Sequence, residues 1–390
     1  MHTLDRVPVV IAAAATGTAA VLVFALLPIF SGALARKFQL DDVQTGLVAT
    51  SYFSVYAIIA FSSSAWVRRF NWKTAALFGY AAMLTGLLLC LAVNSFVLSS
   101  VSLAIVGAGA GLLYPISLTL VSDMEHTDRT YAIKLAAEQL VPAAVLFLLS
   151  SSLFIGYGLS TLLIASISVV ALCLVLSSAL PTQGNVTKHT EDGNGGSIVL
   201  ALIGLLALTL NFSGFAGLWA FLEVIADERD FDPAFTGTWL AVGLITSGVG
   251  PLIAAALADR WGRLAPITVS TLIALSSLFL LVGTVSKLDY AMVLIVLPMG
   301  TYFAISYIFC VVAEADHNGK MAGQMSFALA IAAGGGPVIF GLVRADDGPA
   351  VLGMGVLMAL GAVGIIWVHT RIQRLRSGAS SAVSISISEE

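Results

Sequence analysis

Charged residues are scarce in this chain. Lys, Arg, Asp and Glu make up 10% of its 390 residues, whereas an average soluble domain carries about 25%. The basic residues sit in short segments, and the chain has no dense basic tract of the kind that binds nucleic acid. This shortage excludes an ordinary soluble globular protein, and we expect no nucleic-acid partner.

Residue types that build metal or catalytic sites are also few. The chain has three cysteines, Cys90, Cys173 and Cys310, which are far apart and lie within apolar segments. They show no metal-ligand spacing, so we interpret them as small core residues. No pairing of nucleophile and base, metal constellation or ATP-binding motif is visible. The sequence therefore predicts a protein that is not an enzyme, with no cofactor and no metal.

Apolar residues, by contrast, make up 58% of the chain. They form runs of about 20 residues, which match the roughly 30 Å hydrocarbon core of a bilayer. In lipid the backbone must satisfy its own hydrogen bonds, so such runs form helices, whereas a β-barrel would show an alternating pattern. The sequence predicts an all-α membrane protein with twelve transmembrane helices, near residues 8–34, 44–66, 74–93, 97–121, 131–152, 155–180, 198–225, 234–258, 265–285, 289–312, 321–343 and 350–369.

A polar stretch at 181–197, PTQGNVTKHTEDGNGGS, divides the chain into two similar parts. Six predicted spans precede it and six follow it. We expect an N-terminal six-helix bundle at 1–180, a linker at 181–197 and a C-terminal six-helix bundle at 198–370. The Ser-rich segment 371–390 is predicted to be a disordered tail.

The basic residues also indicate an orientation. Twelve spans place both termini on one side of the membrane, and the loops on that side hold most of the 18 Lys and Arg residues. Because cytoplasmic loops carry the excess of Lys and Arg, both termini and the linker are predicted to be cytoplasmic. We expect a monomeric, multi-pass protein of the cytoplasmic (inner) membrane.

Two short matches indicate that the halves are copies of each other. The segment FQLDDVQTG at 38–46 matches RDFDPAFTG at 229–237, at an offset of 191 residues. The segment GLLYPIS at 111–117 matches GTYFAIS at 300–306, at an offset of 189. Either match alone is weak, but together they predict two pseudo-symmetric six-helix bundles.

The loop after the eighth predicted span reads ALADRWGR at 256–263. It resembles the cytoplasmic G-x-L-A-D-R-x-G-R motif of the major facilitator superfamily. The resemblance implies that superfamily's fold for the whole chain, and secondary transport by alternating access. It also implies that Asp259, Arg260, Gly262 and Arg263 brace the outward-open state on the cytoplasmic side. The alternative is a positively charged turn without a gating role.

The first half departs from this motif. At the same offset of 191 residues, Arg68 stands where the second half has Asp259. The first-half loop, with Arg68 and Arg69, therefore lacks the carboxylate and cannot brace the protein in the same way. Asp123, at the inner end of the fourth span, is a candidate partner for Arg68 or Arg69, and we include all three among the gating candidates.

Glu138 is the sharpest single feature of the predicted spans. It lies about eight residues into the fifth span, which is roughly 12 Å along a helix. Acidic residues within a membrane usually face the protein interior or a wet cavity and mark ion, proton or substrate pathways. Lys134 is one helical turn away, so the alternative is a structural Lys–Glu pair. We take Glu138 and Lys134 as the candidate proton-coupling residues.

The resemblance places the first, fourth, seventh and tenth spans around a central cavity. The candidate substrate-binding residues are then Phe24, Tyr114, Asn211, Trp219, Tyr302, Phe303 and Tyr307. Their rings suit a flat or amphipathic organic molecule, and the alternative is ordinary packing or, for Asn211, a hydrogen bond across helices. Glu223, near the outer end of the seventh span, is a further candidate, either as an outer gate or as a solvated rim charge.

Together these features predict a secondary active transporter that moves a small organic solute across the membrane. The proton gradient is the expected driving force, since no ATP site is visible. Proton antiport for efflux and proton symport for uptake of a nutrient or organic acid are both open, and a non-transporting membrane receptor is an alternative from another class. The expected partners are the organic solute, protons and the lipid bilayer.

Overall fold

The structure is built almost entirely from α-helices. The computed structural model describes residues 4, 6–40, 42–150, 158–184, 197–258, 260–316, 321–344 and 347–388. Within these residues it has twelve α-helices and no β-strand. The α-helices are α1 (Val7–Phe38), α2 (Asp42–Trp66), α3 (Trp72–Ala92), α4 (Phe96–Ser122), α5 (Thr127–Ser150), α6 (Gly158–Leu176), α8 (Ile198–Asp227), α9 (Pro233–Leu257), α10 (Leu264–Leu278), α11 (Lys287–Ala315), α12 (Gln324–Val343) and α13 (Asp347–Ser388). Short 3-10 helices, η1 (Ser177–Ala179) and η2 (Phe279–Leu281), extend α6 and α10.

Each predicted span coincides with one of these helices, which confirms the all-α fold class. Among the described residues, ten helices are long and apolar enough to cross a membrane. The remaining two are more polar, since α2 is rich in Ser and Tyr and α5 contains Lys134 and Glu138. Both lie where the two halves of the protein meet, so their polar groups find partners in protein rather than in lipid.

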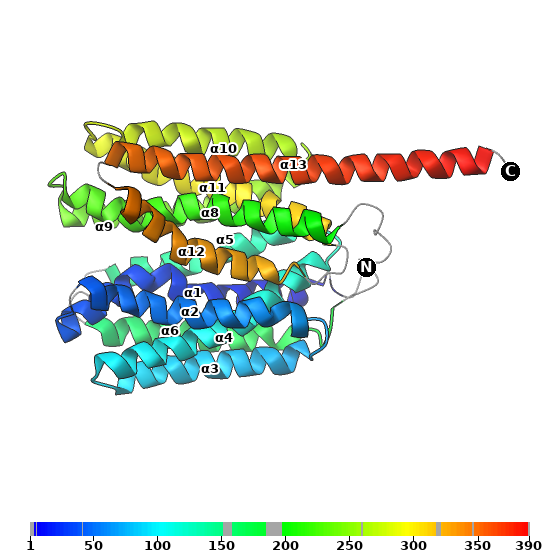
Figure 1. The fold of residues 1–390 in the computed structure, drawn as a ribbon. Helices are drawn as coiled ribbons and strands as arrows, with labels where there is room; N and C mark the ends of the chain where they lie inside the picture. The colour runs from blue at the N-terminus through cyan, green and yellow to red at the C-terminus, as the bar shows by residue number, and fades with distance from the viewer. Residues whose placement is uncertain are drawn as a thin grey trace.

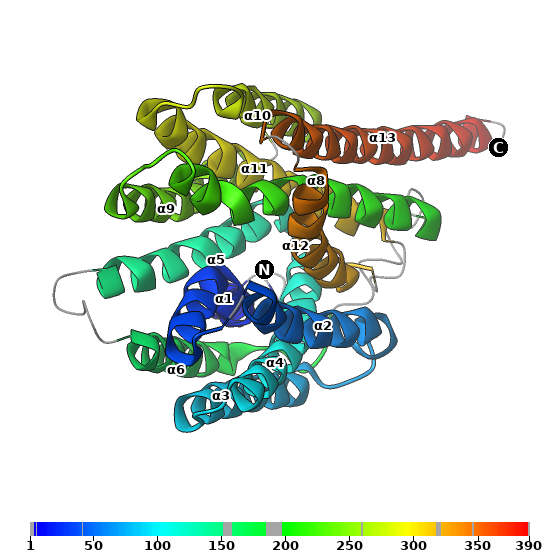
Figure 2. The same ribbon diagram turned by 60° about the vertical axis from the view of Figure 1, so that its left-hand side comes forward.

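The helices form two bundles, α1–α6 and α8–α13, which lie side by side (Figure 1). They meet along two seams, where α2 packs against α12 and α5 packs against α9. Figure 2 shows α5 and α12 at the boundary between the bundles, while α3 and α10 lie on opposite outer sides. The seams therefore bring together helices that are far apart in the chain.

The repeat seen in the sequence extends to the backbone. Helices α2 and α9 each have 25 residues, and both their first and their last residues are 191 positions apart. Just before them, Gln39 and Asp230 occupy equivalent positions and have left-handed φ angles of 54° and 53°. Left-handed backbone is uncommon for residues other than glycine. Its recurrence at the same place in both halves supports a shared ancestral loop.

Glycines let α3 and α4 pack closely. A Cβ atom added at Gly109 would lie under 3.0 Å from the carbonyl oxygen of Gly79, and one at Gly86 would lie under 3.0 Å from that of Ser102. Small residues at helix interfaces allow such close backbone approach in membrane proteins. The glycine-rich run of α4 is therefore explained by helix packing.

The C-terminal segment differs from the expectation of a disordered tail. Helix α13 continues to Ser388 and projects beyond the bundle (Figure 1). Extending an existing helix requires no new nucleation step, and residues 371–388 contain no proline to end it. The composition of this segment is thus compatible with a helix that starts within the bundle.

We predict that Gly109→Ala lowers the stability of the protein, by about 1–3 kcal/mol, because the added methyl group overpacks the α3–α4 interface. The measurement is thermal unfolding in detergent, followed by circular dichroism. Gly334→Ala in α12 is the matched control, since a Cβ atom there meets nothing within 4 Å. Equal melting temperatures for the two variants would contradict this packing role.

Candidate functional site

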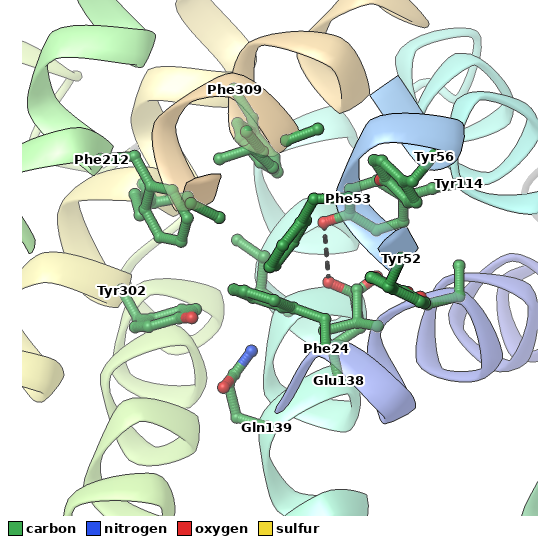
Figure 3. Close-up of a pocket in the computed structure, with 17 residues that line it drawn as sticks. Phe24, Tyr52, Phe53, Tyr56, Tyr114, Glu138, Gln139, Phe212, Tyr302 and Phe309 are labelled. Atoms are coloured by element: carbon green, nitrogen blue, oxygen red, sulfur yellow. Dashed lines mark hydrogen bonds between the residues drawn. The ribbon is translucent and has the colours of Figure 1, made fainter. Parts of the chain in front are cut away.

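A cavity lies between the two halves, lined by 17 residues (Figure 3). Its volume is about 40 Å³, which is room for about three water molecules. The lining comes from α1, α2, α4 and α5 on one side and from α8, α11 and α12 on the other. The lining residues are Ala20, Val21, Phe24, Tyr52, Phe53, Tyr56, Tyr114, Leu135, Glu138, Gln139, Phe212, Tyr302, Ile305, Phe309, Leu329, Ala330 and Ala333.

Eight of the 17 residues in the cavity wall are aromatic. They are Phe24, Tyr52, Phe53, Tyr56, Tyr114, Phe212, Tyr302 and Phe309. Phe24 packs edge-on against Phe53, with 5.5 Å between ring centroids, which is a preferred arrangement for aromatic pairs. Such a wall offers a large apolar surface and few hydrogen-bonding groups.

Glu138 is the charged residue of this lining, and it lies near the middle of α5. Its Oε1 forms an ion pair with Lys134 Nζ one turn earlier, and both side chains are 1% exposed. The Tyr114 hydroxyl donates a hydrogen bond of 3.1 Å to Oε2. Lys134 Nζ also lies 4.1 Å from the centroid of the Tyr114 ring. One phenol therefore contacts both members of the pair.

The pair has room because α1 carries a glycine opposite it. A Cβ atom at Gly17 would lie under 3.0 Å from both Glu138 Oε1 and Ser117 Oγ. Ser117 in turn donates a 2.7 Å hydrogen bond to the backbone oxygen of Ala13. Helices α1, α4 and α5 therefore enclose the pair, and any side chain at position 17 would displace it.

Polar side chains near the cavity connect the two halves. Ser247 of α9 donates a 3.3 Å hydrogen bond to Gln139 Oε1 of α5. Tyr56 of α2 and Ser326 of α12 share a hydrogen bond of 2.7 Å. Gln139 directly follows Glu138 in α5, and both side chains line the cavity. The lining therefore includes two adjacent residues of α5.

A second polar cluster lies at the end of the bundle where the linker begins, here called the linker end. Arg263, directly before α10, makes two hydrogen bonds of 2.9 Å to Asp128 at the start of α5. It also pairs with Glu314 of α11, which in turn pairs with Arg376 of α13. Arg263 therefore connects the second half of the protein to the first.

Asp128 and Arg263 perturb each other's ionisation at the linker end. Burial raises the pKa of the Asp128 carboxyl, but the hydrogen bonds and charge of Arg263 outweigh burial and bring that pKa below its ordinary value. Burial lowers the pKa of Arg263, whereas its bonds to Asp128 raise it, with a net increase. Both groups are thus held in their charged forms near neutral pH.

The first-half loop has a different arrangement. Arg68 forms two hydrogen bonds to Asp123, of 2.5 and 2.7 Å. The start of the linker packs on this pair, because a Cβ atom at Gly184 would lie under 3.0 Å from both side chains. The Trp72 amide also donates a 2.8 Å hydrogen bond to the backbone oxygen of Thr182. Arg68 and Asp123 therefore bind each other within one half.

Another linker-end contact crosses between α12 and α2. Gln324 Nε2 donates hydrogen bonds of 2.9 Å to Ser63 Oγ and to the backbone oxygen of Phe61. Gly323 packs beside the same serine, with 3.1 Å between an added Cβ and Ser63 Oγ. Both seams are therefore bridged by polar groups near the linker end.

The family follows from a comparison of the sequence with known families. A model described as Major Facilitator Superfamily matches residues 11–341. The chain belongs to the major facilitator superfamily. Members of this superfamily are transporters and not enzymes, so the prediction that the protein is not an enzyme is confirmed. A comparison with curated proteins gives no match.

Solved structures of the superfamily have the same fold. The chain is similar to the transporter FucP in its outward conformation, with a TM-score of 0.72 and 16% identity over 94% of this chain and 99% of that one. It is similar to human MFSD10, an organic anion transporter, with a TM-score of 0.69 and 17% identity over 92% of this chain and 99% of that one. It is also similar to the proton:xylose symporter XylE bound to 6-bromo-6-deoxy-D-glucose, with a TM-score of 0.68 and 13% identity over 91% of this chain and 93% of that one. These likenesses confirm the superfamily's fold for this chain.

Three of the predicted substrate-binding residues line the cavity of this superfamily member: Phe24, Tyr114 and Tyr302. Asn211 faces α13 instead, where its Nδ2 donates a 2.9 Å hydrogen bond to the backbone oxygen of Met358. Trp219 stacks on Phe215, with 5.7 Å between ring centroids, and is outside the lining. For Asn211 the structure favours the alternative of a hydrogen bond across helices.

Two more of these candidates, Phe303 and Tyr307 of α11, lie outside the cavity lining. Tyr307 donates a 2.9 Å hydrogen bond to the backbone oxygen of Ala258, so it holds the C-terminal end of α9. Phe303 packs against Tyr307, at 5.5 Å between ring centroids, and is not in the cavity lining. Glu223 lies in the helical backbone of α8, but its side chain is outside the described residues.

The gating candidates fall into two groups. Arg68, Asp123 and Arg263 form the ion pairs given above. Arg69 and Arg260 are exposed, and Gly262 has a left-handed φ of 62°, a conformation in which glycine avoids steric strain. Asp259 lies outside the described residues.

Sequence reasoning missed the lining residues of α2, namely Tyr52, Phe53 and Tyr56. It also missed Phe212 and Phe309, which lie on helices already expected to border the cavity. The signal for α2 was present, since Tyr52 and Tyr56 are four residues apart and share one helix face. Because only the first, fourth, seventh and tenth spans were expected to border the cavity, the two tyrosines of α2 were not among the candidates.

We predict that Asp128→Asn destabilises the protein at pH 7 by about 2 kcal/mol, since a charge-assisted hydrogen-bonded contact is lost. The folded-state pKa of Asp128 is depressed. Its contribution is therefore present above its unfolded value of about 3.9 and is lost as the pH falls through the lower folded value. Melting temperatures of both proteins, measured in detergent at pH 7, 5 and 3, should converge toward pH 3. A gap that widens on acidification would be inconsistent with this pair.

Proposed function

We propose that the protein is a proton-coupled secondary transporter of a small, largely apolar organic solute. The observation that carries the proposal is Glu138, which lies in the wall of an aromatic cavity between the two halves and is paired with Lys134. Solute and proton then have neighbouring sites at the interface of the repeats, where transporter sites form.

The position of Glu138 supports a role in proton coupling. A purely structural ion pair needs only a partner, whereas Glu138 also faces a cavity with room for water. Intramembrane carboxylates in such positions are typical of proton and substrate pathways. Glu138, with Lys134 as its partner, is therefore the proposed site of proton binding and release.

The cross-half contacts support alternating access. Arg263–Asp128 and Gln324–Ser63 fasten the linker ends of the two halves together. The solved structure of FucP, which is similar to this chain, is in an outward conformation. We propose that this protein is closed at the linker end and that this end is cytoplasmic. Breaking the Arg263–Asp128 and Gln324–Ser63 contacts then opens the cavity to the cytoplasm. The cavity of about 40 Å³ must widen for any organic solute to enter.

The cavity lining disfavours a sugar as the solute. A sugar carries a hydroxyl group on most of its carbons, and each buried hydroxyl requires a hydrogen-bonding partner. The polar side chains of the lining are Glu138, Gln139 and four tyrosines, of which Tyr52, Tyr56 and Tyr114 already bond to protein. We therefore propose an amphipathic solute that is exported by proton antiport. Proton symport is the second candidate, supported by XylE, a proton:xylose symporter.

We predict that Glu138→Gln abolishes proton coupling, with a loss of gradient-driven flux of roughly ten-fold or more. Proteoliposomes with an imposed pH gradient would be tested with ethidium, benzoate and L-fucose as labelled solutes. Glu125→Gln, an exposed residue just before α5, is the matched control. Unchanged gradient-driven flux in Glu138→Gln would exclude the carboxylate as the proton carrier.

We predict that Gly17→Ala impairs the same coupling while both charged residues remain. The added methyl group occupies the space of Glu138 Oε1 and forces the pair to move. Gradient-driven flux of the same three solutes should fall at least several-fold, while circular dichroism shows an intact helical fold. Full coupling in Gly17→Ala would show that the observed geometry of the pair is not required.

A further inference from the structure

The charges at the cavity define the substrate class more narrowly. Among the described lining residues Glu138 is the charged one, and it faces the cavity directly. Lys134 is absent from the lining and lies behind Glu138, against Gly17 of α1 and the Tyr114 ring. A solute in the cavity therefore meets a carboxylate first and reaches the ammonium group only past it.

The aromatic rings of the cavity wall also favour a positively charged solute. The faces of aromatic rings attract cations and repel anions, because the ring quadrupole is negative above and below its plane. Eight of the 17 lining residues are aromatic. Lys134 Nζ itself lies 4.1 Å from the Tyr114 centroid, so one ring at the site already accommodates a cation.

Charge balance then determines how a cation can be held. The Lys134–Glu138 pair has zero net charge when both groups are ionised, and a monocation bound beside it would leave one uncompensated positive charge in the membrane. Such a charge is costly. Loss of one proton from the pair restores neutrality: an N–H bond of Lys134 breaks, its electron pair remains on Nζ, and the proton passes to water in the cavity. Glu138 is then left as the counter-ion of the solute.

The groups around the pair allow this exchange without a further charge. Tyr114 of α4 donates a hydrogen bond to Glu138, and Tyr56 of α2 and Tyr302 of α11 line the same cavity. All three are phenols, which are neutral near pH 7. Helix α1 presents Gly17. The pair is thus the titrating unit of the described site.

We infer that the cavity binds an aromatic or amphipathic organic monocation in exchange for one proton of the Lys134–Glu138 pair. This inference rests on the proposed function and specifies its substrate class and its direction of coupling. The bound cation replaces the lost proton of Lys134 as the positive charge beside Glu138, so transport is a one-for-one exchange that moves no net charge.

The test uses purified full-length protein in weakly buffered detergent solution, with benzyltrimethylammonium as a cation whose charge is independent of pH. Its addition should release close to one proton per bound cation. Its Kd should rise about tenfold for each unit that the pH is lowered through the titration of the pair. The pH dependence of the wild-type protein needs no variant and is therefore free of folding artefacts.

Two variants complete the experiment. Glu138→Gln should lose both cation binding and proton release, whereas Glu125→Gln should keep both. Benzoate is the competing probe: if benzoate binds with proton uptake and the cation does not bind, the inference is overturned while proton-coupled transport stands. If neither the cation, benzoate nor L-fucose changes the protonation of the wild-type protein, both the inference and the proposed function fail.

Discussion

A charge enclosed in a membrane-spanning bundle must be compensated within the protein, and this constraint governs where the charged side chains of the chain lie. Burying an ion costs several kcal/mol unless a partner and hydrogen bonds compensate it. Lys134 and Glu138 meet this requirement with each other and with Tyr114. Helix α1 meets it with a glycine, because only the absence of a side chain at Gly17 leaves space for the pair. The site thus depends on three helices, although its charges come from one.

The two copies of the repeat satisfy the same constraint in different ways. Helices α2 and α9 begin and end at equivalent positions, so the loops that follow them start from the same geometry. In the first half Arg68 pairs with Asp123 of its own bundle and is covered by the start of the linker. In the second half Arg263 crosses to Asp128 of the other bundle. One copy therefore stabilises a bundle internally, and the other fastens the two bundles together.

The sequence was sufficient to predict the twelve helices, the duplication and the family motif. Each of these predictions rests on a feature that spans several residues: the length of the apolar runs, the offset of about 191 residues between the two halves, and the charged turn between two helices. The cavity was harder to predict. Helices that are apolar on all sides carry little periodic signal, so the direction in which Asn211 or Tyr307 points could not be deduced, and both lie outside the lining. Glu138 was found because a charge in an apolar run is conspicuous, whereas Tyr52 and Phe53 were not, because an aromatic residue in such a run is ordinary.

The small volume of the cavity connects the site to the linker-end contacts. A space of about 40 Å³ has room for about three water molecules, so the proposed organic solute requires the bundles to move. The bonds that oppose this motion on one side include Arg263–Asp128 and Gln324–Ser63. The cavity-facing bonds Tyr56–Ser326 and Ser247–Gln139 lie on the same two seams. Sliding of α2 against α12, or of α5 against α9, therefore disturbs the cavity wall and the linker-end contacts together. The proposed solute site next to Glu138 is in this way mechanically connected to the linker-end contacts.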